Sequence, residues 1–153
     1  MKRPPAIAVI GAGDAPAAVR ELAFAIGEEV ARAGALLICG GLGGVMEAAA
    51  RGARERGGHT VGILPGYNTD TANPYIEFPI ATGMGEARNA AVVGSADAVI
   101  ALAGEGGTLA EIGFALKLGR PIVALSAWNE LAGLHRASSP AEAVATALAQ
   151  IKR

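Results

Sequence analysis

The residues best suited to chemistry lie in the stretch Ala103–Glu111, which reads AGEGGTLAE. This stretch follows an apolar run, Ala96–Leu102, and opens a segment with helical periodicity, Thr108–Leu118. A strand, a glycine-rich turn and a helix start, in that order, direct free backbone N–H groups and the positive end of a helix dipole at one point. A phosphate group is the usual occupant of such a point. The turn contains no lysine, so it is not a Walker phosphate-binding loop.

Thr108 and Glu111 are three residues apart and therefore lie on the same edge of the expected helix. One interpretation is a capping box, T-x-x-E, in which the two residues only close the helix end. The other interpretation is that the carboxylate of Glu111 acts in a binding or catalytic site. The spacing alone favours capping, and the case for a site depends on the rest of the chain.

Glycine-rich turns follow two other apolar runs. Gly11–Gly13 comes after Ala6–Ile10, and Gly40–Gly44 comes after Ala35–Cys39. In an open parallel sheet the carboxyl ends of the strands share one edge, where ligands bind. We therefore expect these two turns and Gly104–Thr108 to line one cleft.

Apolar runs alternate with alanine-rich helical segments along the 153 residues. The chain is 52% hydrophobic but only 4% aromatic, so its core must be built from Ala, Val, Ile and Leu. This pattern predicts a single α/β domain over residues 1–153, a Rossmann-like doubly wound parallel sheet with helices on both faces. The expected strands are residues 6–10, 35–39, 60–64, 76–80, 96–102 and 121–125. The first expected helix ends near residue 33, and the others span about residues 45–56, 84–93, 108–118 and 140–151.

One segment is of a different kind. Pro65–Tyr75, PGYNTDTANPY, is rich in turn-forming residues and has no periodicity, so we expect a loop. Loops of this length in compact domains are often lids or binding loops.

Composition excludes several classes of function. The net charge is −1 and the 13 basic residues are scattered, which argues against binding to nucleic acid or to a membrane surface. No stretch is long enough to cross a bilayer, and a cytoplasmic protein is expected. The one cysteine, Cys39, excludes an internal disulfide and a Cys-rich metal site. His59 and His135 are expected to be structural or exposed, so we predict no metal and no resident cofactor.

The sequence does not fit two common classes of nucleotide- or cofactor-binding protein. The third glycine of a G-x-G-x-x-G dinucleotide motif would be Pro16, and the second strand ends in Cys39-Gly40 without an acidic residue for a ribose. A pyridoxal-phosphate enzyme needs a Schiff-base lysine on a suitable element. The lysines are Lys2, Lys117 and Lys152, two of them terminal and one late in a helix.

The two main glycine loops together resemble those of the LOG-like (Lonely Guy) group of Rossmann-type proteins, once mislabelled lysine decarboxylases. The family pattern G-G-x-x-G-x-M matches Gly40–Met46, and a family arginine on a helix matches Arg88 in GEARN. The family loop P-G-G-x-G-T-x-x-E matches Ala103–Glu111. The similarity extends from the first strand to about Leu125. It is closest to a short-chain branch that includes molybdenum-cofactor carrier-like proteins.

The resemblance implies a function. Catalytic members of the family hydrolyse the N-glycosidic bond of a nucleoside 5′-monophosphate to free base and ribose 5-phosphate. Carried over, their essential pair becomes Arg88 and Glu111, with the carboxylate stabilising oxocarbenium character on the ribose or orienting water. The resemblance also implies a homodimer, which the alanine-rich and weakly charged helix faces favour. The residues expected to hold the phosphorylated ligand are Gly11, Gly13, Gly40, Gly41, Gly43, Gly44, Met46, Gly104, Gly106, Gly107 and Thr108.

The chain departs from the family pattern at four positions. Ala103 replaces a proline, which costs little beyond loop stiffness. Glu105 replaces a glycine where a phosphate should approach, Ala110 replaces a common acidic residue, and Asn89 follows Arg88 where the enzymes often have lysine. Binding tolerates such changes more easily than catalysis. Two functions therefore remain open: a nucleoside monophosphate phosphoribohydrolase, or a non-catalytic carrier or sensor of a nucleotide or of the molybdenum cofactor, a phosphorylated pterin.

Overall fold

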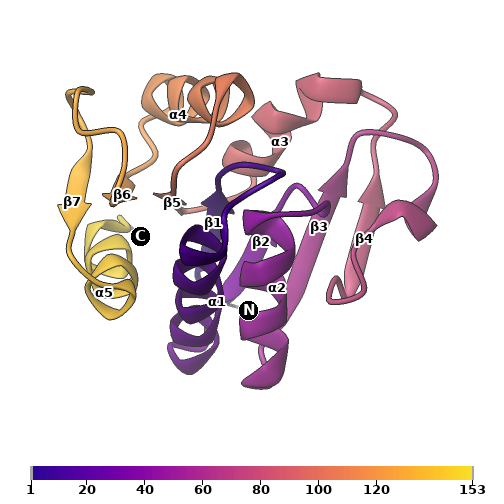
Figure 1. The fold of residues 1–153 in the computed structure, drawn as a ribbon, viewed down its shortest axis with the longest axis horizontal. Coiled ribbons are helices and arrows are strands. Elements are labelled where there is room, and N and C mark those ends of the chain that lie inside the picture. The colour runs from indigo at the N-terminus through magenta and orange to yellow at the C-terminus, as the bar shows by residue number, and fades with distance from the viewer. Residues whose placement is uncertain (1, 153) are drawn as a thin grey trace.

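A seven-stranded sheet runs through the centre of the molecule (Figure 1). This computed structural model describes residues 2–152. Every neighbouring pair of strands is parallel, in the order β4-β3-β2-β1-β5-β6-β7. The strands are β1 (Ala6–Ile10), β2 (Leu36–Cys39), β3 (Thr60–Leu64), β4 (Phe78–Ala81), β5 (Ala98–Ala101), β6 (Ile122–Leu125) and β7 (His135–Ala137).

Helices cover both faces of the sheet (Figure 1). One layer contains α1 (Ala17–Arg32), α2 (Val45–Glu55) and α5 (Pro140–Gln150), and the other contains α3 (Arg88–Gly94) and α4 (Gly106–Leu118). The chain moves outward from β1 to β4 on one side and from β5 to β7 on the other. The switch point of this doubly wound fold therefore lies between β1 and β5, where such sheets bind ligands. The predicted Rossmann-like α/β fold is confirmed.

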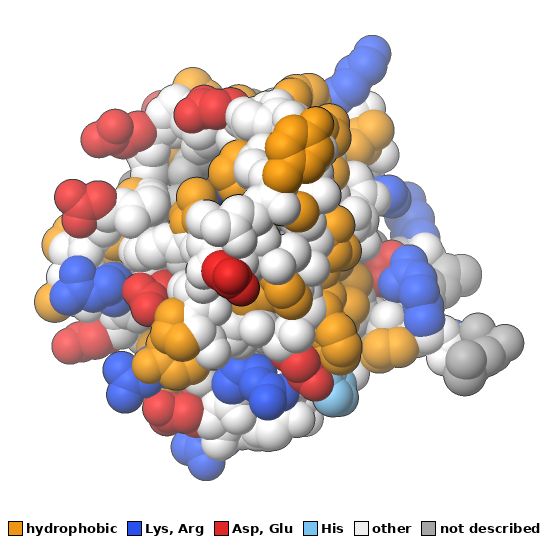
Figure 2. Space-filling view, turned by 90° about the vertical axis from the view of Figure 1, so that its right-hand side faces the viewer, with side chains coloured by type: hydrophobic (Ala, Val, Ile, Leu, Met, Phe, Trp, Pro, Cys, Tyr) orange, Lys and Arg blue, Asp and Glu red, His pale blue; other side chains and the backbone are white. Residues whose placement is uncertain are grey.

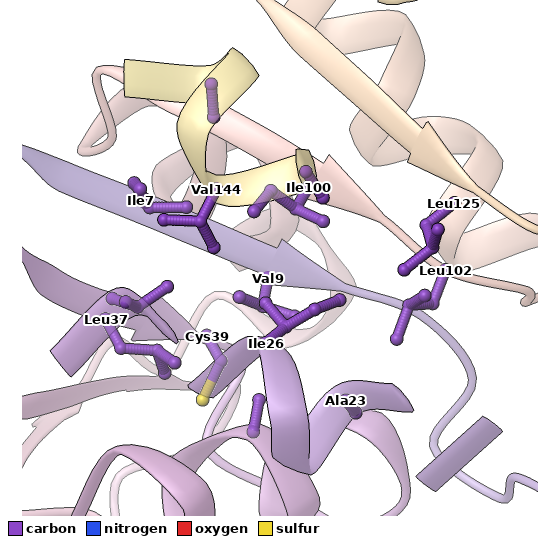
Figure 3. Packing of buried hydrophobic residues seen from close by; sticks show 14 of the residues in the cluster. Ile7, Val9, Ala23, Ile26, Leu37, Cys39, Ile100, Leu102, Leu125 and Val144 are labelled. Carbon is purple, nitrogen blue, oxygen red and sulfur yellow. The ribbon is translucent and has the colours of Figure 1, made fainter. Parts of the chain in front are cut away.

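The core is built from aliphatic side chains, as the composition requires. Along β1 the side chains alternate between the layers, so Ile7 and Val9 pack toward α1 and α5, whereas Ala8 and Ile10 pack toward α3 and α4. Figure 3 shows residues of the cluster on the side of α1 and α5, among which Cys39 is fully buried.

The backbones of α1 and α2 touch because each helix carries a glycine at the contact. A Cβ at Gly27 would lie 2.0 Å from the carbonyl oxygen of Ala49, and one at Gly52 would lie 2.0 Å from that of Phe24. These contacts hold the two helices close to each other.

Several elements differ from expectation. The helix expected from Met84 is instead a 3-10 helix, η2 (Gly85–Ala87), followed by α3, because Gly85 has a φ of +59° that a regular helix does not allow. The short edge strand β7 was not predicted at all. Ser139 caps α5 as expected and accepts a 3.2 Å hydrogen bond from the backbone N–H of Glu142.

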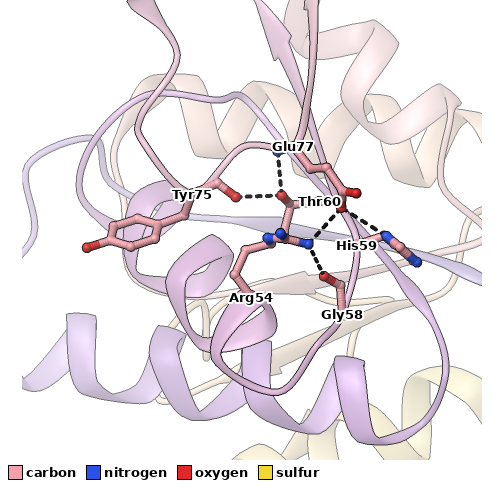
Figure 4. A network of polar contacts seen from close by, with 6 residues as sticks. All are labelled: Arg54, Gly58, His59, Thr60, Tyr75 and Glu77. Carbon is pink, nitrogen blue, oxygen red and sulfur yellow. Dashed lines mark hydrogen bonds and ion pairs between the residues drawn. The ribbon is translucent and has the colours of Figure 1, made fainter.

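The long loop between β3 and β4 is anchored at its end by polar contacts (Figure 4). Thr60 Oγ1 donates a 2.6 Å hydrogen bond to the carbonyl oxygen of Tyr75 and accepts one from the N–H of Glu77. The Glu77 carboxylate in turn binds Arg54 at 2.8 Å and His59 at 2.9 Å. Within the loop lies a second 3-10 helix, η1 (Thr69–Thr71).

The helices found between residues 2 and 152 are each too short or too polar to cross a bilayer.

Candidate functional site

A cleft of about 520 Å³ lies at the carboxyl edge of the sheet, beside the switch point between β1 and β5. Its walls come from the turn after β1, the loop after β2, the end of β3, the η2–α3 segment and the first turns of α4. The lining residues are Val9, Ile10, Gly11, Ala12, Gly13, Asp14, Gly40, Leu42, Met46, Pro65, Glu86, Arg88, Asn89, Glu105, Gly107, Thr108 and Glu111.

Main-chain hydrogen bonds tie the three glycine-rich turns together. The N–H of Ala12 donates to the carbonyl oxygen of Ala103 at 2.9 Å, and the carbonyl oxygen of Ala12 accepts from the N–H of Val45 at 3.0 Å. A Cβ at Gly44 would lie 2.2 Å from the Ala12 oxygen, and one at Gly104 would lie 3.0 Å from the Ala12 nitrogen. These glycines therefore allow the turns to pack against each other.

The structure brings some of the predicted site residues to the lining of the cleft and leaves others outside it. Those that line it are Gly11, Gly13, Gly40, Met46, Arg88, Gly107, Thr108 and Glu111. Those that do not are Gly41, Gly43, Gly44, Gly104 and Gly106. Gly41 and Gly44 have φ of +78° and +63°, so glycine is favoured at both positions by the backbone conformation and not by contact with a ligand.

Helix α4 points its N-terminus at the cleft. The helix begins at Gly106, and its N-cap, Glu105, makes no side-chain capping bond. The first helical bond recorded at this end runs from the N–H of Leu109 to the carbonyl oxygen of Glu105. The N–H groups of Gly106, Gly107 and Thr108 are thus left over from the helix, as at any uncapped N-terminus. The capping-box interpretation of Thr108 is wrong, because the helix starts two residues before it.

Arg88 is the first residue of α3 and is only 9% exposed. Its Nη1 donates to the side-chain oxygen of Asn89, and its Nη2 donates to the carbonyl oxygen of Gly40 at 3.4 Å. Its Nε is buried and has no hydrogen-bond partner among the described residues. A buried cationic N–H without an acceptor is costly, and because Arg88 lines the cleft, the charge of its guanidinium favours an anionic ligand there.

Glu111 lies on the second turn of α4 and is 8% exposed. Burial raises the pKa of its carboxyl to about 7, and the positive charge of Arg88 opposes this rise. Arg88 and Glu111 line the same cleft, yet no ion pair joins them in the part of the chain that is described. Near neutral pH the carboxyl of Glu111 therefore keeps its proton far more readily than an ordinary glutamate does.

The cleft also contains residues that the sequence did not single out as ligand-binding. Pro65 follows β3 directly, so its place at the same edge of the sheet was the available signal. Glu86 reaches the cleft through the η2 turn, for which the sequence gave no comparable signal. Asn89 was noted only as a departure from the catalytic pattern. Asp14, Glu86 and Glu105 are exposed carboxylates at the cleft, where Arg88 is the one basic lining residue.

Phosphate binding at this site must therefore rely on N–H groups and the dipole of α4 as much as on net charge. Between residues 2 and 152 there is no group of three or more His, Cys, Asp or Glu side chains arranged to hold a metal ion.

The sequence profile of the SLOG cluster4 family matches residues 4–151. The chain belongs to the SLOG cluster4 family. This membership confirms the predicted LOG-like resemblance, whereas the roles of Arg88 and Glu111 stay predictions.

Three proteins show the place of this SLOG cluster4 chain among its relatives. An uncharacterized protein of Archaeoglobus fulgidus is 44% identical over 138 residues, covering 90% of this chain and 91% of its own. The molybdenum cofactor binding protein of the phototrophic bacterium Rippkaea orientalis is 35% identical, with a TM-score of 0.93 over 99% of this chain and 100% of its own. The molybdenum cofactor carrier protein of Chlamydomonas reinhardtii is 34% identical, with a TM-score of 0.85 over 97% and 98% of the two chains.

Proposed function

We propose that this protein binds the molybdenum cofactor, a phosphorylated pterin, in the cleft at the carboxyl edge of the sheet and acts as its carrier. The observation that carries the proposal is the buried, unpartnered Nε of Arg88 at the wall of this cleft. Similarity along almost the whole chain to two proteins named for this cofactor supports it.

The lining residues fit such a ligand. The cleft volume of about 520 Å³ lies within the usual range for small-molecule sites. The uncapped N-terminus of α4 and the guanidinium of Arg88 would hold the phosphate. Apart from its chain neighbours and the backbone of its own helix, no described residue lies within 4 Å of where a Cβ of Gly106 would stand, and only Asn89 Nδ2 lies near that of Gly107, at 3.6 Å. This leaves the backbone there open to an anion.

The remaining lining suits a planar, polar ring. Leu42, Met46 and Pro65 offer apolar surface, and Asn89 and Glu111 offer polar groups. A carboxyl with a pKa of about 7 can donate or accept a hydrogen bond near neutral pH, as the polar edge of a pterin requires. In this role Glu111 positions the ligand and needs no reaction partner.

One observation favours a second candidate, hydrolysis of a nucleoside 5′-monophosphate. A buried carboxyl with a raised pKa beside an arginine is typical of catalytic sites. However, Glu105 stands at the N-cap of α4 and lines the cleft, and Ala110 stands exposed before Glu111. Both are positions at which the chain departs from the catalytic pattern. We therefore favour the carrier function over hydrolysis.

The carrier function is tested by retention of the cofactor. The protein is incubated without oxygen with free molybdenum cofactor and separated by gel filtration, and the protein fraction is assayed for molybdenum and for pterin fluorescence. We expect wild type to retain both and Arg88→Gln to lose most of both. Arg51→Gln is the matched control, because Arg51 lies exposed on α2 and pairs with Glu55. Wild type that retains neither molybdenum nor pterin contradicts the proposal.

The hydrolase alternative is tested in parallel with AMP, GMP, CMP and UMP, by assaying the free base. A carrier releases none. Base release that disappears in Glu111→Gln would instead support the phosphoribohydrolase, with Arg88 and Glu111 as its working pair.

We also propose that the protein is a homodimer and works in the cytoplasm, as the sequence led us to expect. Its weakly charged helix faces support the dimer, which light scattering of the purified protein tests. A monomer at micromolar concentration would contradict it.

A further inference from the structure

The pairing of β5 with β1 changes at Leu102, directly before the turn that leads into α4. Leu102 is 1% exposed, and its N–H donates to the carbonyl oxygen of Ile10 at 2.9 Å. If the regular parallel pairing continued, the N–H of Ala12 would donate to the carbonyl oxygen of Leu102. That N–H donates instead to the oxygen of Ala103, one residue further along. The buried carbonyl oxygen of Leu102 is therefore left out of the sheet and needs another donor.

The side chain of Trp128 supplies this donor. Its indole Nε1–H donates a 2.9 Å hydrogen bond to the carbonyl oxygen of Leu102. Trp128 follows β6, the neighbour of β5 in the sheet, and its ring packs against the apolar cluster on the side of α3 and α4. The carbonyl groups of Leu102 and Ala103 are thus held by two different segments of the chain, one after β6 and one after β1. Together these bonds fix the backbone where the chain enters the turn.

Trp128 has a backbone conformation that large residues rarely adopt. Its φ is +61°, and Ser126, two residues earlier, has a φ of +58°. Between residues 2 and 152 these are the only positive φ values outside glycine. Glycine adopts such a conformation without strain, but it has no side chain that could reach Leu102. Strain of this kind persists only where the surrounding contacts impose it, and it is concentrated at functional sites.

Arg136 on β7 holds the strained segment in place. Its guanidinium donates to the carbonyl oxygens of Ala127, Trp128 and Leu131, at 3.2, 2.6 and 2.8 Å. A charged side chain on an edge strand often serves only to prevent pairing with another chain. The other edge strand, β4, carries no charged residue and exposes apolar side chains such as Phe78, which is 51% exposed (Figure 2). The sheet does not rely on charge at both edges, and the three bonds give Arg136 a role within its own chain.

We propose that Trp128 is a positioning residue for the phosphate-binding end of the cleft. By holding the carbonyl oxygen of Leu102, it sets the direction in which the chain leaves β5 and enters α4. The N–H groups of residues 106–108 follow within a few positions, so their orientation toward the cleft depends on that direction. Arg136 acts through Trp128, because it holds the backbone that carries the indole. The inference rests on the proposed binding of a phosphorylated ligand, although Trp128 does not itself line the cleft.

The first test removes the indole N–H and needs no ligand. Trp128 is the sole tryptophan of the chain, so expression in a tryptophan auxotroph fed benzothienylalanine, with sulfur in place of the N–H, changes this position alone. Protein made with 4-fluorotryptophan, which keeps the N–H, is the matched control.

Amide hydrogen exchange, followed by NMR, reports on the turn in these proteins. We expect the N–H of Ala12 to exchange about tenfold faster in the sulfur analogue, because its acceptor on Ala103 is held less firmly. The N–H of Leu37, bonded to the carbonyl oxygen of His59 far from the turn, should not change. Unchanged exchange at Ala12, or equal acceleration at both amides, would overturn the inference whatever the ligand is.

The second test measures binding of the molybdenum cofactor, with and without phosphatase treatment, to the same proteins under nitrogen. The sulfur analogue should bind the phosphorylated form about tenfold more weakly and the dephosphorylated form as well as the control does, because only the phosphate contacts the turn. A purely structural role would lower the thermal stability and leave both affinities of the folded protein unchanged. Equal weakening for both forms would show that Trp128 does not act on the phosphate end.

Replacing Arg136 provides an independent variant that keeps the indole. Arg136→Gln should have the same selective effect on the phosphorylated form, since the backbone of Trp128 is released. Arg56→Gln is its matched control, because Arg56 is an exposed arginine that pairs with Glu28 on the α1–α2 side. Wild type that binds neither form contradicts the proposed function. Binding that is identical with and without the indole N–H contradicts only the role of Trp128.

Discussion

Nη2 of Arg88 donates a 3.4 Å hydrogen bond to the carbonyl oxygen of Gly40, which lies 48 residues earlier, directly after β2. A Cβ at Gly40 would stand 2.9 Å from this nitrogen and 2.6 Å from the sulfur of Met46. Position 40 therefore requires glycine, because the side chains of Arg88 and Met46 lie against it. Through this contact the loop after β2 and the start of α3 are held together.

Replacing Gly40 by alanine should harm both stability and binding. The added Cβ must displace Arg88 or Met46, so we expect Gly40→Ala to lower the free energy of unfolding by about 1–3 kcal/mol. Denaturant unfolding measures the first effect and cofactor retention the second. Gly106→Ala is the matched control, since it has open space around its Cβ and should leave stability equal or slightly higher. Equal losses in both variants would contradict this account of Gly40.

Replacing Arg88 should separate binding from stability. Hydrogen bonds to charged groups contribute about 1.5–3 kcal/mol, so Arg88→Met should weaken binding of the phosphorylated ligand by about 10- to 100-fold. Without ligand, the same change removes the unpartnered Nε–H, which favours folding, and the hydrogen bonds to Asn89 and Gly40, which opposes it. We therefore expect a smaller loss of stability than of binding. Calorimetric titration and thermal unfolding test the two statements. A variant that binds normally would show that the cleft does not use this guanidinium.

The stability contributed by Glu111 should depend on pH. Its pKa is about 7 in the folded protein, against an ordinary value of 4.5, so the folded state holds its proton more tightly than the unfolded state does. The free energy of unfolding therefore falls as pH rises from 4.5 to about 7, by up to about 3 kcal/mol. Glu111→Gln should be more stable than wild type at about pH 8 and similar to it at about pH 4.5.

Glu142 provides a control of the opposite sign for this experiment. Hydrogen bonds from Ser138 lower the pKa of Glu142, so its contribution is present above the ordinary pKa and disappears in acid. Glu142→Gln should thus be less stable than wild type near neutral pH. If Glu111→Gln also destabilises the protein there, Glu111 is not held at a raised pKa.

The cap of α5 offers a test of local structure far from the cleft. Ser139 accepts a hydrogen bond from the N–H of Glu142, and Pro140 begins the helix. We expect Ser139→Ala to lower the free energy of unfolding by about 1 kcal/mol without changing cofactor retention. Urea unfolding checks the first part. Loss of cofactor retention in this variant would show that α5 is coupled to the cleft.

Apolar runs and glycine-rich turns were sufficient to predict most of this fold. Buried parallel strands read as continuous apolar segments, and β1, β2, β5 and β6 do so, whereas β3 also contains Thr60 and Gly62. The strand β7 reads His-Arg-Ala and was missed, because its extended form comes from pairing with β6 and not from its own residues. Similarly, α4 starts at two glycines that have low helix propensity, so propensity placed its start too late.

The site was predictable only in part, for a related reason. The sequence located the turns that share one edge of the sheet, and Arg88 and Glu111 both reach the cleft there. It did not distinguish glycines that face the cleft, such as Gly107, from those that let one turn pack on another, such as Gly104. That distinction depends on contacts between segments far apart in the chain. The unpaired Nε of Arg88 also appears only once the neighbouring atoms are in place.

The backbone hydrogen bonds that join Ala12 to Ala103 and to Val45 hold the three turns at the cleft together within the protein itself. Little conformational entropy remains to be lost there when a molecule binds. We therefore expect the backbone of these turns to be equally ordered with and without a bound ligand. If the protein carries the proposed cofactor, its release would therefore depend on the rim, where Glu86 and Glu105 are exposed, and a receiving enzyme would take the cofactor from that side.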